Sequence, residues 1–203
     1  CINKEIIKEL SLDISDSYID GTKIEANANK YKFVWKPVKF HIKLDIKIKE
    51  LLDKIGYEYS KELIKAYYYN QILKSYAKKN NIDVNNIPTG RGKRLTAEQR
   101  NYKVGYGYLV KLVEYEEKER ICGKNRNSYF KTDHDATAMV LKEDYYSKLS
   151  HDFHAGYNVQ VMVSSLLILM YGVFQDRSDI NTLIPMNDLY FKYYGKYPIN
   201  ECD

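Results

Sequence analysis

The stretch SYIDGTKIEANANKYKFVW, residues 17 to 35, decides how the rest of the chain is interpreted. It begins as a β-prone run that leads through Asp20 into Gly21, and a carboxylate at the end of a strand is held rigidly enough to bind a metal ion. Asp-Gly between two β-prone runs is also a strong hairpin-turn signal, and in that case Asp20 only turns the chain. The spacing alone leaves both interpretations open.

The second half of this stretch alternates basic, polar and aromatic residues, a mixture that suits a phosphate backbone and stacked bases. Lys23, Lys30 and Lys36 are therefore candidates for phosphate contacts. Trp35 permits a role in the same interaction, but a single Trp is more typical of a core anchor, and we expect it to be buried.

Three stretches, in the same order along the chain, resemble motifs of DDE transposases from bacterial insertion sequences. The first, DGTKIEANANKY from Asp20 running on to FVWK, resembles the first acidic motif of that family. The second is NSYFKTDHDAT, residues 127 to 137, in which His134 stands where these transposases commonly carry Pro. The third begins with GYNVQ at Gly156 and continues through FQDRSD to TLIP, which ends at Pro185.

The resemblance implies an α/β fold: a ribonuclease H-like mixed sheet, here partial, with an all-helical insertion after the first strand. It also implies a DNA transposase that cuts and joins transposon-end DNA by metal-dependent phosphoryl transfer. Carboxylates from separate strands would hold Mg²⁺ or Mn²⁺, and Asp20 and Asp203 would be two of these ligands. The family usually reads Ala-Asp-Ala-Gly-Tyr at the second acid, so that acid is either Asp203 or the residue after it.

The third acid of the family, a Glu further downstream, has no counterpart here. Because the chain starts at Cys1 without Met and stops at Asp203, we expect a fragment of a longer protein that is inactive in catalysis on its own. The expected partners are transposon-end and target DNA, on which the full-length protein would act as a homo-oligomer. Three other functions stay open: a nuclease of the same fold, a catalytically inactive DNA-binding remnant, and a helical interaction protein built on residues 46–120.

The composition is that of a soluble globular protein, with 44% hydrophobic and 29% charged residues in a chain of 203. A net charge of +5 favours an anionic partner only weakly. Three cysteines without pair spacing indicate free thiols in a reducing compartment, and the longest apolar run is too short to cross a bilayer. We therefore expect a cytoplasmic protein with no membrane partner.

The hydrophobic patterning divides the chain into three parts. Residues 1–45 hold the first core strand with a preceding helix over residues 2–10, residues 46–124 form the helical insertion, and residues 125–203 form the rest of the core. The insertion is expected to fold as a pair of helices, an arrangement that permits an antiparallel hairpin. Gly56 is a point where the first helical run divides into two helices.

Two local signals lie inside the insertion. Thr96 and Gln99 form a capping-box signature at the start of its second helical run. Just before it, the loop GRGKR supplies Arg91, Lys93 and Arg94 as further candidates for phosphate contacts, although such a loop is more often simply solvated.

Asp133 and Asp135 permit two interpretations. In an extended segment the two carboxylates share a face and bind a cation, whereas in the other case Asp135 caps a following helix and neither binds metal. We expect the cap. His151 and His154 flank Asp152 in the manner of a metal pair, but without a third ligand in register we expect them to be surface residues.

The last part of the chain reads as a strand hairpin followed by a helix. Residues 157–163 and 166–174 are apolar, β-branched runs with a plausible turn between them. A helix is expected from Ser178-Asp179 to Tyr194, with Pro185 marking a kink or a restart, and a further strand is expected over residues 197–203.

Overall fold

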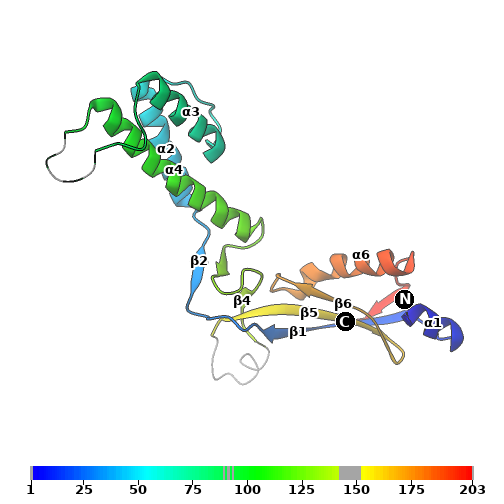
Figure 1. The fold of residues 1–203 in the computed structure, drawn as a ribbon. Coiled ribbons are helices and arrows are strands. Elements are labelled where there is room, and N and C mark those ends of the chain that lie inside the picture. Colours follow the sequence, from blue (N-terminus) through cyan, green and yellow to red (C-terminus); the bar gives the residue numbers. More distant parts are fainter. Residues whose placement is uncertain (1, 89, 91, 93, 142–151, 203) are drawn as a thin grey trace. The chain divides into compact units, whose positions relative to one another are not determined.

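The computed structural model describes residues 2–88, 90, 92, 94–141 and 152–202 (Figure 1). The chain divides into two compact units. Cys1–Val34 and Lys124–Asp203 form the first, called here the sheet unit, and Trp35–Gly123 forms the second, called the helical unit. Among the helices of the described residues, none combines the length and the apolar character needed to cross a bilayer.

The sheet unit is built around β1, Asp16–Glu25, which lies between two partner strands. On one side β5 (His154–Ser164) runs antiparallel to it, and on the other side β7 (Asn200–Cys202) runs parallel to it. β6 (Leu167–Phe174) and β4 (Thr137–Met139) both pair with β5 in the antiparallel sense. The strand order is β4-β5-β1-β7 with β6 also on β5, so the protein has a mixed α/β fold.

The predicted strands are present, but both interpretations of Asp20 are wrong. The β-prone run that leads into Asp20 belongs to β1, which pairs with the first strand of the expected hairpin, and the second strand follows after a turn at which Ser165 has a φ of 53°. Asp20 and Gly21 lie in the middle of β1, where they pair with Val161 and Gln160. Asp20 therefore neither ends the strand nor forms the tip of a hairpin.

The core of the sheet unit lies between the sheet and α6, Leu183–Tyr194. Met186 and Tyr190 of α6 pack with Ile19 of β1 and Met162 of β5, all of them buried. Because successive side chains of a strand point to opposite faces, these contacts assign the odd-numbered residues of β1 to the face that α6 covers.

The remaining elements of the sheet unit are short. They are α1 (Ile2–Glu9), β3 (Ser128–Phe130) and the 3-10 helix η1 (Asp179–Thr182), together with β2 (Phe33–Trp35), whose last residue is the first of the helical unit. β2 and β3 form a separate two-stranded sheet. The predicted helix towards Tyr194 is confirmed as η1 followed by a restart in α6, and Pro185 falls in the first turn of α6, where its missing N–H costs nothing.

The helical unit contains three helices in the described residues, α2 (Val38–Ile55), α3 (Ala66–Lys79) and α4 (Ala97–Cys122). The predicted helical pair is therefore wrong, whereas the predicted division of the first helical run at Gly56 is confirmed. Gly56, left-handed with a φ of 74°, ends α2, and α3 follows as a separate helix. The three helices share one buried core, whose largest contributors are Leu44, Ile48, Leu52, Tyr69, Leu73 and Leu112.

Polar side chains fix the ends of these helices. The predicted capping box is confirmed, because Thr96 Oγ1 accepts from the Gln99 N–H at 3.1 Å and Gln99 Oε1 accepts from the Thr96 N–H at 3.1 Å. A carboxylate oxygen of Glu116 accepts from the Ala66 N–H at 3.0 Å, so α4 satisfies a free donor in the first turn of α3. Both interactions stabilise helix starts that have few backbone partners of their own.

Two glycines of α4 have opposite roles. Each lowers the helix propensity by about 1 kcal/mol relative to Ala. A Cβ added at Gly105 would lie 2.7 Å from Leu73 Cδ2 and 3.0 Å from Tyr69 Oη, whereas one added at Gly107 would meet nothing within 4 Å. Gly105 therefore allows the close packing of α4 against buried side chains, and Gly107 serves no such purpose.

We expect Gly107→Ala to raise the free energy of unfolding by up to about 1 kcal/mol, because it adds helix propensity without a clash. Gly105→Ala should lower it by about 1–2 kcal/mol, because overpacking outweighs the same gain. Urea unfolding of the two variants measures both changes. Equal stabilisation by the two substitutions would contradict the close packing at Gly105.

Candidate functional site

Asp20 lies on β1, an interior strand of the sheet. At Asp20 itself β1 is paired with β5, opposite Val161, whereas the described part of β7 pairs with β1 from Asp16 to Tyr18. Its neighbours Ile19 and Gly21 are buried, while Asp20 itself is exposed. Since Ile19 packs under α6, the alternation along the strand places the Asp20 side chain on the opposite face of the sheet. The carboxylate is thus exposed to solvent on a backbone that the pairing with β5 holds in place.

β7 brings the end of the described chain next to β1. The parallel register pairs Asp16 with Asn200 and Tyr18 with Cys202. Asp203, the predicted second acid, lies outside the described residues. The proposed pair of Asp20 with Asp203 therefore stays a prediction.

The metal expectation depends on the donors that surround Asp20. A carboxylate oxygen is the hard ligand that Mg²⁺ and Mn²⁺ prefer, so Asp20 itself fits either ion. Among the described residues, however, no group of three or more His, Cys, Asp or Glu side chains is placed to hold a metal ion. Asp20 is one donor of a suitable kind, and the described residues do not supply a complete set around it.

A buried polar network lies on the other face of the strands, directly behind Asp20. Gln160 Nε2 donates to Asp179 Oδ1 at 2.8 Å and to Asn158 Oδ1 at 2.9 Å, and Asn158 Nδ2 donates to the same Asp179 oxygen at 2.7 Å. Gln160 and Asn158 are almost fully buried. A Cβ at Gly21 would lie 2.0 Å from Gln160 Nε2. Because Gly21 has no Cβ, the Gln160 amide can occupy the space beside it.

The structure contradicts the predicted cap at Asp135. The element that directly follows Asp135 is the strand β4, not a helix. Asp133 takes the turn-forming role instead: its Oδ1 accepts from the N–H groups of Asp135 and Ala136 at 3.1 and 3.2 Å, and its Oδ2 accepts from the Tyr157 hydroxyl at 2.5 Å. The two acids thus have different partners, and Asp135 Oδ1 accepts from Gln175 Nε2 at 3.2 Å.

These contacts change the ionisation of the Asp133–Tyr157 pair. The hydrogen bond from the Tyr157 hydroxyl, together with those from the N–H groups of Ala136 and Asp135, holds the pKa of Asp133 below its ordinary value. Partial burial, together with the same hydrogen bond, raises the pKa of Tyr157 to about 12. At neutral pH Asp133 is therefore an ionised acceptor and Tyr157 a protonated donor, an arrangement that fixes the segment before β4.

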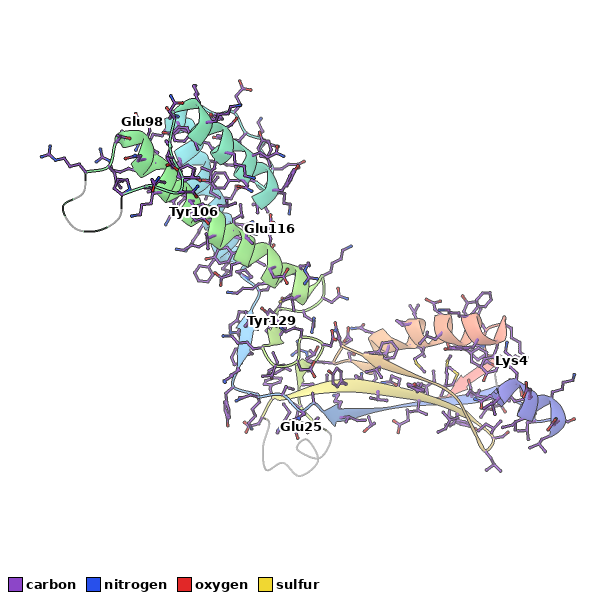
Figure 2. All side chains as sticks on the ribbon, in the orientation of Figure 1. Lys4, Glu25, Glu98, Tyr106, Glu116 and Tyr129 are labelled. Atoms are coloured by element: carbon purple, nitrogen blue, oxygen red, sulfur yellow. The ribbon has the colours of Figure 1, made fainter. Side chains whose placement is uncertain are left out.

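His154 is less exposed than predicted. Its side chain retains 18% of its accessible surface, and its Nδ1 lies 2.8 Å from Oε1 of Glu25. Glu25 is the last residue of β1 and is labelled in Figure 2. His151 lies outside the described residues. The contact between His154 and Glu25 joins the ends of β5 and β1, so its clearest role is in strand pairing.

The predicted phosphate contacts divide between the two units. Lys23 and Lys30 belong to the sheet unit, where Lys23 is half-buried on β1 and Lys30 Nζ lies 3.7 Å from Asp152 Oδ2. Lys36 and Arg94 belong to the helical unit, where Lys36 Nζ donates to the Gly123 carbonyl at 2.6 Å and Arg94 is exposed. Arg91 and Lys93 lie outside the described residues.

The prediction that Trp35 is a core anchor is wrong. Its side chain is 65% exposed, and the aromatic residues at alternate positions before it, Tyr31 and Phe33, are 81% and 46% exposed. The signal that identifies this group is the alternation of aromatic residues with lysines from Lys30 to Lys36, which a buried strand would not tolerate.

Comparison of the chain with protein-family models, with curated proteins and with solved structures finds no match in any of the three. The family resemblance therefore rests on the three quoted stretches and on the chemistry of their residues.

Proposed function

We propose that this chain is part of a DNA transposase with a ribonuclease H-like core, which cuts and joins DNA by metal-dependent phosphoryl transfer. The observation that carries the proposal is the position of Asp20, exposed in the middle of the interior strand β1. The strand order supports it as well: β6, β5 and β1 are antiparallel neighbours, and β7 joins them parallel to β1 after α6. Along the chain, the strand β1, helices, the two strands β5 and β6, the helix α6 and the strand β7 follow one another, as the sequence leads us to expect.

The proposed chemistry is in-line attack at phosphorus, which requires positioning and neutralisation of charge more than covalent participation of the protein. Asp20 supplies an anionic oxygen from a strand that is paired with β5 at that position, so its backbone needs little reorganisation. The parallel register places Cys202 of β7 level with Tyr18 of β1, two residues before Asp20. A second carboxylate near Asp20 would complete the pair of ligands that the resemblance implies, and Mg²⁺ held there would supply charge stabilisation at the phosphate oxygens.

The proposed function predicts that the protein binds duplex DNA with little dependence on base sequence. It also predicts that the affinity falls steeply as the salt concentration rises. If about four of the proposed cations neutralise phosphates, affinity should fall roughly a hundredfold between about 50 and 200 mM salt. Titration of labelled duplexes of two unrelated sequences at both salt concentrations measures this.

Substitution then tests whether the named cations are responsible. Lys30→Gln and Lys36→Gln should each reduce the salt slope by about one. Lys74→Gln, which removes an exposed lysine of α3 outside the proposed set, should leave the slope unchanged. Absent binding, binding insensitive to salt, or an equal effect of the control substitution would each count against the proposal.

A further inference from the structure

Three exposed aromatic side chains follow one another at alternate positions up to Trp35, the residue at which the helical unit begins. Tyr31, Phe33 and Trp35 retain 81%, 46% and 65% of their accessible surface. Tyr31 lies in the turn before β2, whereas Phe33 and Trp35 are the first and last residues of β2, so the side chains of these two leave the strand on the same side. Exposed rings of this size, so close in sequence, have an energetic cost that a binding function explains.

The backbone that carries these rings is fixed by several hydrogen bonds. Asn29 orders the turn before β2: its side-chain oxygen accepts from the Tyr31 N–H at 3.0 Å, and its carbonyl accepts from the Lys32 N–H at 3.0 Å. Asn29 is itself tied to the segment after β3, because its N–H donates to Thr132 Oγ1 at 3.2 Å. The Lys131 N–H donates to the Lys32 carbonyl at 2.9 Å, which continues the pairing of β2 with β3.

A ring on a fixed strand loses little conformational freedom when it binds a partner. The backbone that carries the three rings is therefore ordered before a partner binds. In this respect the segment differs from an exposed aromatic residue on a mobile loop.

The charge around the rings identifies the kind of partner. Lys30, Lys32 and Lys131 lie within this small sheet or next to it, and residues 29 to 36 contain no acidic side chain. The contact of Lys30 with Asp152 is long, at 3.7 Å, and the Asp152 side chain is 70% exposed, so water screens this ion pair and it neutralises little charge. Binding of an apolar protein surface here would desolvate these ammonium groups without giving them a new partner. A nucleic acid instead provides phosphates that pair with the ammonium groups and bases that stack on the rings.

The spacing of the rings selects unpaired bases over a duplex. Alternate residues of a strand are about 6.8 Å apart, twice the roughly 3.4 Å rise between stacked bases of a duplex. Neighbouring rings on β2 cannot both contact adjacent stacked bases, but each can accept a base from a strand whose bases are separated. Duplex ends and single strands provide such bases, while the interior of a duplex does not.

We infer that Tyr31, Phe33 and Trp35 form a stacking platform for unpaired bases of single-stranded DNA, with Lys30, Lys32 and Lys131 near its phosphates. The choice of DNA over RNA rests on the proposed transposase function, while the platform itself rests on the exposure, alternation and charge described above. The platform binds a single strand independently of any chemistry at Asp20.

Because Trp35 is the single Trp of the chain, its fluorescence reports the platform directly. The probes are a deoxythymidine oligomer, an abasic oligomer of the same length and charge, and a blunt duplex, each titrated into the full chain with selective excitation of Trp. We expect the thymidine oligomer to quench the emission and to bind more tightly than the abasic oligomer. If the abasic oligomer quenched the emission as strongly and bound as tightly as the thymidine oligomer, the binding would depend on phosphate contacts alone. That result would overturn the inference.

Substitutions, measured with a labelled thymidine oligomer, assign the binding to individual rings. Phe33→Ala and Trp35→Ala should each weaken binding by about 5- to 100-fold, and Trp35→Phe should retain most of the affinity because it retains a ring. Tyr67→Ala is the matched control, since Tyr67 is 77% exposed on α3, and it should have no effect. Unchanged affinity in Phe33→Ala and Trp35→Ala would overturn the inference.

The two proposals fail in different ways. Loss of thymidine binding in the ring variants, with salt-dependent duplex binding retained, supports the platform whatever the outcome of a cleavage assay. Trp emission that changes with protein concentration in the absence of DNA would identify a second copy of the chain as the occupant and overturn the assignment to single strands.

Discussion

Replacement of Asp20 by Asn is expected to abolish DNA cleavage by a transposase that contains this chain, with DNA binding retained or slightly tighter. The substitution removes an anionic oxygen from the proposed metal site, and loss of one pre-organised charged group of this kind costs roughly three orders of magnitude in rate. It also removes a negative charge next to the phosphate path, which explains the direction of the effect on binding. Asp20 is exposed, so the free energy of unfolding should change by less than about 0.5 kcal/mol.

The same strand offers a matched control for this experiment. Asp16 is also exposed, also on β1, and on the same side of the strand as Asp20 because the two positions differ by an even number. Asp16→Asn should leave cleavage of transposon-end DNA with Mg²⁺ essentially unchanged. Full activity of the Asp20→Asn protein, or equal loss in both variants, would show that the active site lies elsewhere. A parent protein that binds DNA and does not cleave it would instead be an inactive remnant.

A second large effect is expected one residue further along β1. Gly21→Ala would bring a Cβ within 2.0 Å of Gln160 Nε2 and within 2.7 Å of Gln160 Cδ. The Gln160 side chain cannot swing away without loss, because it is 2% exposed and donates to both Asn158 and Asp179. We expect the free energy of unfolding to fall by about 2–4 kcal/mol, from overpacking and from loss of buried hydrogen bonds. Urea unfolding at neutral pH measures the change.

A double-mutant cycle separates this clash from other effects of the substitution. Gln160→Ala removes the obstructing amide, so Gly21→Ala should cost much less in that background than in the native chain. The difference between the two costs is the coupling energy of the pair. A coupling energy near zero would show that the two residues do not compete for the same space.

Sequence predicted the elements whose signals are local. The alternation of residues 17 to 24 predicted β1, and the two apolar runs after Gly156 predicted the β5–β6 hairpin. Thr96 and Gln99 predicted the start of α4 because a capping box is made by residues three apart. Each of these signals depends on neighbours in the chain, so a single sequence is enough to detect it.

Sequence failed where distant residues decide the local structure. Asp133 accepts a hydrogen bond from the hydroxyl of Tyr157, which is 24 positions away. No sequence pattern near Asp135 reveals that this distant hydrogen bond orders the segment. The size of Trp35 predicted burial, yet the residue is 65% exposed at the end of the short strand β2. A strand end and a hairpin turn were the two interpretations of Asp20, and both are wrong because β5, from the last part of the chain, pairs with β1 as far as Glu25.

The arrangement of β1 has a consequence for the order in which the protein folds during synthesis. β1 is translated well before its partners: Ser164 Oγ donates to the Asp16 carbonyl across 148 positions. The buried core of the helical unit is formed by residues from Leu44 to Leu112, all of which are made before β5. Until β5 and β7 have been made, β1 has two unpaired edges, and sheet closure must await long loop closure. During that time β1 of the nascent chain is open to pairing with other chains.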